Sequence, residues 1–132
     1  MNKNSNYKKQ KLVAMLIVAS FCFFSCEKKI ISSVQPLPDI VSFSHHIMPI
    51  FNAHCNVSGC HSGGSSTGEL NLSPGFAYSK LFADGEIDTV NASNSNLYIM
   101  VASCQMPKAG NKLSDYDIGL IQKWIRQKAK NN

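Results

Sequence analysis

Seven consecutive residues, from Cys55 to His61, hold the most reactive side chains of the sequence. They read Cys-Asn-Val-Ser-Gly-Cys-His, so two thiols are separated by four residues and an imidazole follows the second thiol directly. Two thiols this close can form a disulfide in an oxidising compartment. Together with His61 and either His54 or Cys104 they could instead bind zinc, because Cys₂His₂ and Cys₃His sets are tetrahedral zinc shells.

A histidine directly after the second cysteine is also the arrangement that attaches haem in c-type cytochromes. At this point the chain resembles the class I cytochrome c family, over roughly residues 43 to 132. The family motif is usually CxxCH, and here it is widened to CxxxxCH, where Ser58 and Gly59 can form the extra turn because glycine adopts conformations closed to other residues. The adjacent histidine and the order of helices favour haem over a disulfide, and zinc is the weakest reading because the chain has no second close cysteine pair.

The resemblance extends to residues far from the motif. Met106-Pro107 resembles the loop whose methionine supplies the second axial ligand, and Phe51 and Trp124 resemble the aromatics through which the first and last helices pack. The resemblance therefore implies one covalent haem c, attached through Cys55 and Cys60, with its iron bound by His61 and Met106. It also implies a carrier of single electrons rather than an enzyme, although a peroxidase or ligand-binding activity at an open iron site is left open.

Four other residues compete with Met106 or are left over. His45, His46 and His54 are most simply surface or helix-end residues, but each could act as the distal ligand. Met100 and Met48 are expected to be ordinary core. Cys104, two residues before Met106, is expected to be a buried thiol.

The N-terminal block has the layout of a signal peptide. Four lysines and no acid lie between residues 3 and 11, and residues 12 to 25 are apolar or small. This run of 14 residues is shorter than the roughly 20 that a membrane-spanning helix needs. Residues 1–25 are therefore expected to be removed.

The end of this block resembles the lipobox of bacterial lipoproteins. It reads Phe24-Ser25-Cys26, and the resemblance implies that Cys26 is acylated and becomes the mature N-terminus. Residues 26–41 are then the lipidated N-terminus and tether, and residues 42–132 the cytochrome c-like domain. We expect a membrane-anchored lipoprotein that faces the periplasm of the bacterial envelope, with redox donor and acceptor proteins as partners.

The charge of the chain argues against nucleic acid as a partner. The formal net charge is +5, and the four lysines of the signal block account for most of it, which leaves +1 on the mature chain. A nearly neutral protein lacks the electrostatic footprint of a nucleic-acid binder.

The elements that must position these residues are helices. Apolar spacing and capping residues predict helices over 43–54, 74–83 and 96–103, and a last helix that begins after Ser114. Pro49 must lie in the first turn of its helix or kink it. Ser95 and Ser114 are the expected N-caps of the last two helices, and Gly85 is the expected stop of the second. No stretch long enough for a β-strand alternates between polar and apolar residues. We therefore predict an all-α fold of three to five helices around a covalently bound haem.

Overall fold

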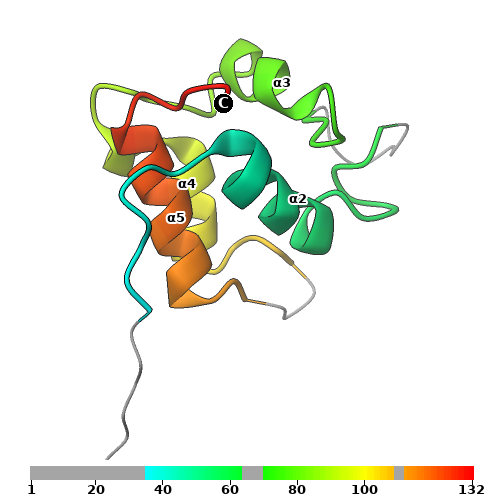
Figure 1. Ribbon diagram of the computed structural model, residues 1–132. Helices are drawn as coiled ribbons and strands as arrows, with labels where there is room; N and C mark the ends of the chain where they lie inside the picture. The colour runs from blue at the N-terminus through cyan, green and yellow to red at the C-terminus, as the bar shows by residue number, and fades with distance from the viewer. Residues whose placement is uncertain (1–34, 64–69, 109–111) are drawn as a thin grey trace, which may run out of the picture. The chain divides into compact units, whose positions relative to one another are not determined.

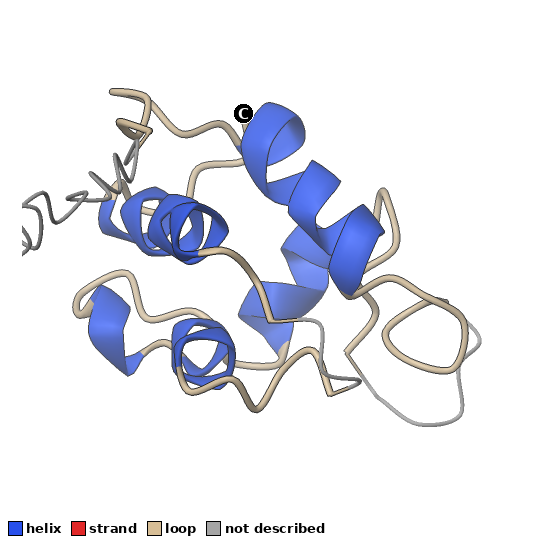
Figure 2. Cartoon of the chain, turned by 90° about the horizontal axis from the view of Figure 1, so that it is seen from below, coloured by secondary structure: helices blue, strands red, loops and turns tan. Residues whose placement is uncertain are grey.

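The computed structural model describes residues 35–63, 70–108 and 112–132, which all belong to one unit, Val34–Asn132. Over these residues the chain is helical and contains no strand (Figures 1 and 2), which confirms the all-α prediction. The elements in chain order are η1 (Phe43–Ile47), α2 (Met48–His54), α3 (Ala77–Ala83), η2 (Ala92–Asn94), α4 (Asn96–Ala102) and α5 (Asp115–Arg126). The predicted signal peptide and Cys26 lie outside the described residues. None of the described helices is long and apolar enough to cross a bilayer.

The first predicted helix is present with the predicted bounds, as a π-helical turn, η1, that runs directly into α2. Ser42 caps it, because its side chain accepts a hydrogen bond from the backbone N–H of His45. Pro49 stands in the first turn of α2, where its missing N–H costs least. The residues Ile47 and Phe51 are fully buried, so the periodic face predicted from the sequence is the face that packs.

The two middle helices differ in detail from the prediction. Helix α3 begins at Ala77 rather than at residue 74, because the N–H groups of Phe76 and Ala77 both bond to the Ser73 carbonyl at 3.0 Å and close a turn first. Gly85 follows the end of α3 with a φ of +73°, as expected of a stop. Ser95 precedes α4 as predicted, but its hydroxyl does not cap the helix. It is buried and instead accepts from the Asp88 N–H at 2.8 Å.

Helix α5 packs against η1, η2 and α4, and it carries the centre of the core. Ser114 caps it by accepting from the Asp117 N–H, and Ile121, Trp124 and Ile125 on its apolar face are completely buried. Trp124 and Phe51 are both buried as the resemblance implied, but Phe43 of η1 lies between them. Its ring centroid is 5.2 Å from that of Trp124 and 6.3 Å from that of Phe51.

The C-terminal residues tie the start of the domain to its end. The Asn132 carbonyl accepts from the Ser44 N–H at 2.8 Å and from the Ser42 hydroxyl at 2.7 Å. The Gln127 side chain bonds the Val41 N–H and the Asp39 carbonyl, at 2.9 and 2.6 Å. The last residues of the predicted tether are therefore bonded to the helical domain, and Val41 is part of its core.

Candidate functional site

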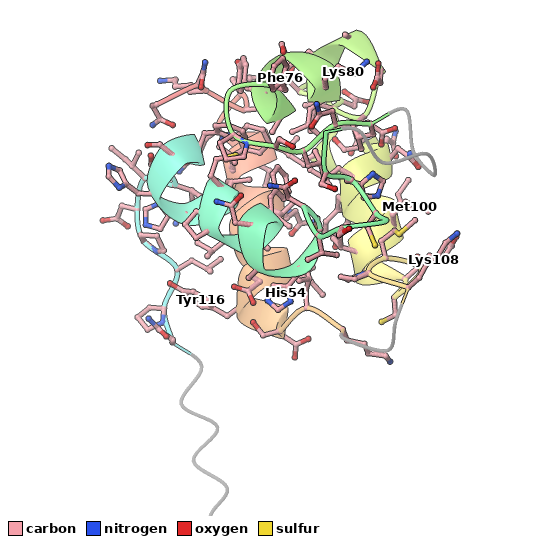
Figure 3. All side chains as sticks on the ribbon, turned by 90° about the vertical axis from the view of Figure 1, so that its right-hand side faces the viewer. His54, Phe76, Lys80, Met100, Lys108 and Tyr116 are labelled. Atoms are coloured by element: carbon pink, nitrogen blue, oxygen red, sulfur yellow. The ribbon has the colours of Figure 1, made fainter. Side chains whose placement is uncertain are left out.

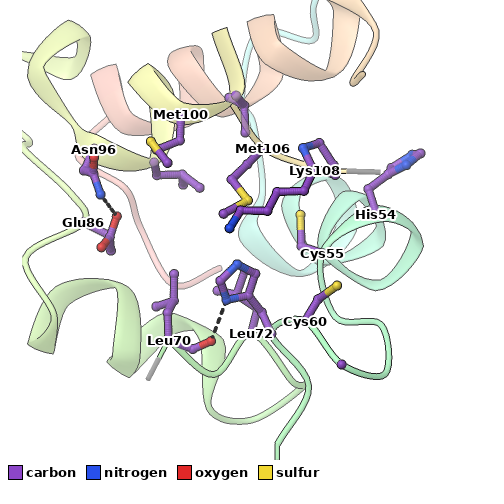
Figure 4. Close-up of a pocket in the computed structure, with 15 residues that line it drawn as sticks. His54, Cys55, Cys60, Leu70, Leu72, Glu86, Asn96, Met100, Met106 and Lys108 are labelled. Carbon is purple, nitrogen blue, oxygen red and sulfur yellow. Dashed lines mark hydrogen bonds between the residues drawn. The ribbon is translucent and has the colours of Figure 1, made fainter. Parts of the chain in front are cut away.

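A cavity of about 430 Å³ opens between the end of α2, helix α4 and the turn that follows α4. Its volume falls in the range of about 300 to 1,000 Å³ that is usual for ligand and cofactor pockets. All four residues that the sequence nominated for a cofactor line it: Cys55, Cys60, His61 and Met106 (Figure 4). Cys55 and Cys60 lie on one side in Figure 4, and Glu86 and Asn96 lie on the other.

The widened cysteine motif folds as a turn that closes on itself. The N–H of Cys55 bonds the Phe51 carbonyl and so ends α2, and the His61 N–H returns to the Cys55 carbonyl at 3.2 Å. Between them the Cys60 N–H bonds the Val57 carbonyl at 3.0 Å, and Gly59 has a φ of +81°. The additional residues are thus taken up in a turn that only glycine enters without strain, which is the role expected of Gly59.

The imidazole of His61 is held in one orientation. Its Nδ1 lies 3.0 Å from the Leu70 carbonyl oxygen, a bond drawn as a dashed line in Figure 4. A carbonyl can only accept, so Nδ1 is the donor, and in the neutral imidazole this tautomer places the lone pair on Nε2. A ring held in this way through its other nitrogen is typical of histidines that ligate metals. The backbone is fixed as well, since the Leu72 N–H donates to the His61 carbonyl at 2.8 Å.

Met106 reaches the cavity from the turn after α4. Its N–H and that of Gln105 both donate to the Met100 carbonyl at 3.0 Å, which turns the chain back over the end of the helix. The thioether of Met106 is half-buried and stands near the middle of the cavity in Figure 4. A soft, neutral sulfur is thereby available in the same cavity as the lone pair of His61.

Met100 was expected in the core, and this expectation is wrong. The side chain is half-buried and lines the cavity with Leu97 and Val101. These three residues fall at i, i+3 and i+4, which places them on one face of a helix. That spacing was a signal in the sequence, but only the position of α4 shows that the face borders a cavity.

The two motif thiols differ in their surroundings. Cys55 is buried, and this burial, with a smaller contribution from neighbouring Cys60, raises the pKa of its thiol from 9.0 to about 11. Cys55 is therefore a neutral thiol at physiological pH. Cys60 is exposed, and both thiols are free rather than joined in a disulfide.

The zinc alternative needs a group of closely spaced ligands. In the part of the chain that the structure describes, no three side chains among His, Cys, Asp and Glu are grouped to hold a metal ion.

The rim of the cavity carries polar residues that sequence reasoning missed. The Asn96 amide donates to the Glu86 carboxylate at 2.7 Å, at the end of the cavity away from the cysteines. Lys108 lies across the cavity in Figure 4 and is exposed. No sequence pattern links these three residues, because they come from two loops and the first turn of α4.

The remaining candidates are distributed unevenly. His54 lines the rim of the cavity, whereas His45 and His46 do not line it, and His46 Nδ1 accepts from the Ser42 N–H at 2.9 Å. Cys104 is exposed, which corrects the expectation of a buried thiol. It follows the end of α4 with a φ of 59°, where the chain reverses on the surface.

The arrangement as a whole suits a large apolar group held at several points. Two thiols stand on one side of the cavity, an imidazole with a free lone pair and a thioether line it, and most of the remaining wall is apolar. No protein-family model, curated protein or solved structure matches this chain.

Proposed function

We propose that the chain is a c-type cytochrome anchored to the bacterial cell envelope, which carries one covalent haem and passes single electrons between redox proteins. One observation carries the proposal: a single cavity collects Cys55, Cys60, His61 and Met106, although Met106 is 45 residues from the motif. The spacing of the motif alone does not require the methionine to be there.

The two thiols would provide the attachment. Each thiol would add across one of the two vinyl groups of the haem. The sulfur would bond to one vinyl carbon and the thiol hydrogen would go to the other, so no oxidant is consumed. The turn around Gly59 sets the separation of the two sulfur atoms.

His61 and Met106 would bind the iron. The Leu70 carbonyl orients the His61 ring through Nδ1, so that Nε2 would be the nitrogen that binds the iron. When bound, haem supplies one-electron exchange at its iron, and a thioether opposite an imidazole raises the reduction potential relative to two imidazoles. The largely apolar wall would act in the same direction by lowering the polarity around the iron.

The experiment is expression in a periplasm that contains cytochrome c maturation proteins, followed by a denaturing gel stained for haem. We expect a stained band that survives heating in detergent and disappears in the Cys55→Ala/Cys60→Ala double variant. Cys104→Ala is the matched control and should keep the band, because Cys104 does not line the cavity. A colourless wild type with stoichiometric zinc, or with a Cys55–Cys60 disulfide, would replace this proposal with a non-redox envelope domain.

Counting thiols gives an independent measurement. In the described residues the protein without cofactor has three free thiols, Cys55, Cys60 and Cys104. After haem attachment only Cys104 should react with a maleimide under denaturing conditions. Three reactive thiols in a coloured protein would show that the pigment is not bound through the motif.

Anchoring is proposed from the sequence and needs its own test. Mass spectrometry of the N-terminal peptide should find an acylated Cys26 as the first residue. Cys26→Ala should release the protein from the membrane fraction, whereas Cys22→Ala, within the predicted signal peptide, should not. Recovery of an unmodified Cys26 would contradict the anchor and leave the haem proposal untouched.

A further inference from the structure

Two thioethers, not one, reach the cavity that contains His61. Figure 4 draws the side chains of Met100 and Met106 entering from α4 and from the turn that follows it, and both residues are half-buried. Figure 3 shows Met100 beside α4, on the same side of the molecule as Lys108. An iron bound by the His61 imidazole would have one further axial position and two sulfur atoms that could take it.

The two methionines sit on different kinds of backbone. Met100 belongs to α4, whose residues Leu97 and Val101 are buried and which packs against α5. Met106 belongs to the non-helical turn that follows α4. Loss of the turn would remove Met106 from the cavity, but the backbone of Met100 would stay in place.

The two positions are also connected directly. The Met100 carbonyl accepts hydrogen bonds from the N–H groups of Gln105 and Met106, both at 3.0 Å. The turn that carries Met106 is therefore bonded to the backbone of Met100. Met100 has three rotatable side-chain bonds, and unbranched thioethers adapt readily to irregular spaces. A change of rotamer can therefore bring its sulfur to a position that Met106 leaves.

We propose that Met100 is an alternative axial ligand, which binds the iron of this site when Met106 is displaced. The inference rests on the proposed haem site and adds to it a second thioether that keeps the iron closed to external ligands. Both sulfur atoms are soft and neutral, so either one favours ferrous iron and the exchange leaves the charge of the site unchanged. The exchange breaks one sulfur–iron bond and forms another, with no change in oxidation state.

The test uses the full-length haem protein and three variants: Met100→Leu, Met106→Leu and the double variant. Leucine keeps the volume and apolar character of methionine but cannot ligate, so the fold should survive. The readouts are the long-wavelength sulfur-to-iron charge-transfer band of the ferric protein and the rate of carbon monoxide binding to the ferrous protein. Met100→Leu should match the wild type in both.

The decisive comparison is between Met106→Leu and the double variant. Met106→Leu should keep the charge-transfer band and bind carbon monoxide at least about tenfold more slowly than the double variant, which corresponds to about 1.4 kcal/mol in the barrier. If Met106→Leu lacks the band and binds carbon monoxide as fast as the double variant, Met100 is not a ligand. If the double variant still binds carbon monoxide slowly, another donor such as Lys108 or His54 occupies the axial position and the inference is wrong.

A measurement on the wild type covers the case in which Met106→Leu does not assemble. In protein labelled with ¹³C at its methionine methyl groups, the Met100 methyl signal should exchange between its unligated position and one shifted as in an iron-bound methionine. Met100→Leu assigns this signal. A Met100 methyl signal without such exchange would overturn the inference. A colourless wild type would instead overturn the proposed function itself, so the two failures are distinguishable.

Discussion

Two regions on either side of the first helix are built in opposite ways. Where η1 meets α5, the rings of Phe43, Phe51, Tyr78 and Trp124 pack edge to face or tilted, with neighbouring centroids 5.2 to 6.5 Å apart. The polar ends of these rings are satisfied internally: Trp124 Nε1 donates to the Lys130 carbonyl at 2.9 Å and Tyr78 Oη to the Ala129 carbonyl at 3.0 Å. We call this region the aromatic core. None of its four rings lines the cavity beside the cysteine motif.

The cavity at the end of α2 has the reverse character. Cys55 is buried, His61 and Met106 are half-buried, and Cys60 at the edge of the cavity is exposed. The aromatic core is completed by the chain itself, whereas the proposed haem would complete the cavity. The comparison teaches that the packed centre of the fold and the candidate site are separate regions, and it can be tested by substitutions that should be costly in one region and mild in the other.

The largest effect is expected in the aromatic core. Trp124→Ala should lower the free energy of unfolding by about 3 to 5 kcal/mol, because it removes a completely buried indole and leaves a cavity. Urea denaturation followed by circular dichroism measures the change. Phe76→Ala is the matched control, since Phe76 is 59% exposed and its loss should cost about 0.5 kcal/mol or less. Equal losses for the two variants would mean that the aromatic core does not carry the fold.

The second effect is a dependence on alkaline pH that originates in the cavity. The pKa of Cys55 is raised from 9.0 to about 11, so the folded state favours the neutral thiol. Its stabilising contribution is present in full below pH 9 and is lost as the pH rises toward 11, by about 3 kcal/mol in all. Urea midpoints of the haem-free protein between pH 8 and 11 should therefore fall more steeply for wild type than for Cys55→Ala.

Other groups titrate in the same range, so this measurement needs a thiol control. Cys104→Ala removes an exposed thiol and should leave the pH dependence as steep as in wild type. If Cys55→Ala shows the same slope as wild type, burial of Cys55 in the folded chain is refuted.

A third, smaller effect is expected at the start of α5, outside both regions. Ser114 accepts from the Asp117 N–H at 3.1 Å, and Ser114→Ala should cost about 1 kcal/mol in stability. Ser93→Ala, at an exposed serine of η2, is the control and should change little. The haem spectrum should stay the same in both variants. A spectral change in Ser114→Ala would show that the helix end and the cavity are coupled, and therefore that the regions are not independent.

The smallest effect is expected from the side chain at the centre of the cavity. Met106→Ala in the haem-free protein should cost only about 0.5 kcal/mol, because a half-buried side chain beside open space leaves no new void. Ile121→Ala, at a completely buried residue, should cost about 2 to 5 kcal/mol by comparison. Chemical denaturation of the two variants measures both values. A comparable loss for Met106→Ala would show that the cavity contributes to stability before any cofactor binds.

Much of the fold follows from local rules that act within a few residues. Ser42 and Ser114 bond to N–H groups three residues ahead, so their caps can be read from the sequence. The buried face of α5 repeats with the period of the helix, and Gly85 ends α3 because its conformation suits few other residues. At Ser95 the capping rule failed because another segment of the chain intervened. Ser95 bonds to Asp88 rather than to its own helix, a choice that depends on the loop before η2.

By itself the sequence determined the helices and one local cluster, because the cysteines, His61 and the turn around Gly59 are neighbours along the chain. Tertiary structure alone decided which distant side chains join them. Met106 and Met100 line the cavity, Cys104 two residues before Met106 is exposed, and the Leu70 carbonyl rather than a side chain orients His61. The Phe43 ring lies between the rings of Phe51 and Trp124. This order depends on how the helices cross. The physical reason is range: capping and periodicity act within a turn or two of helix, whereas a cavity is the space left over when all the helices have packed.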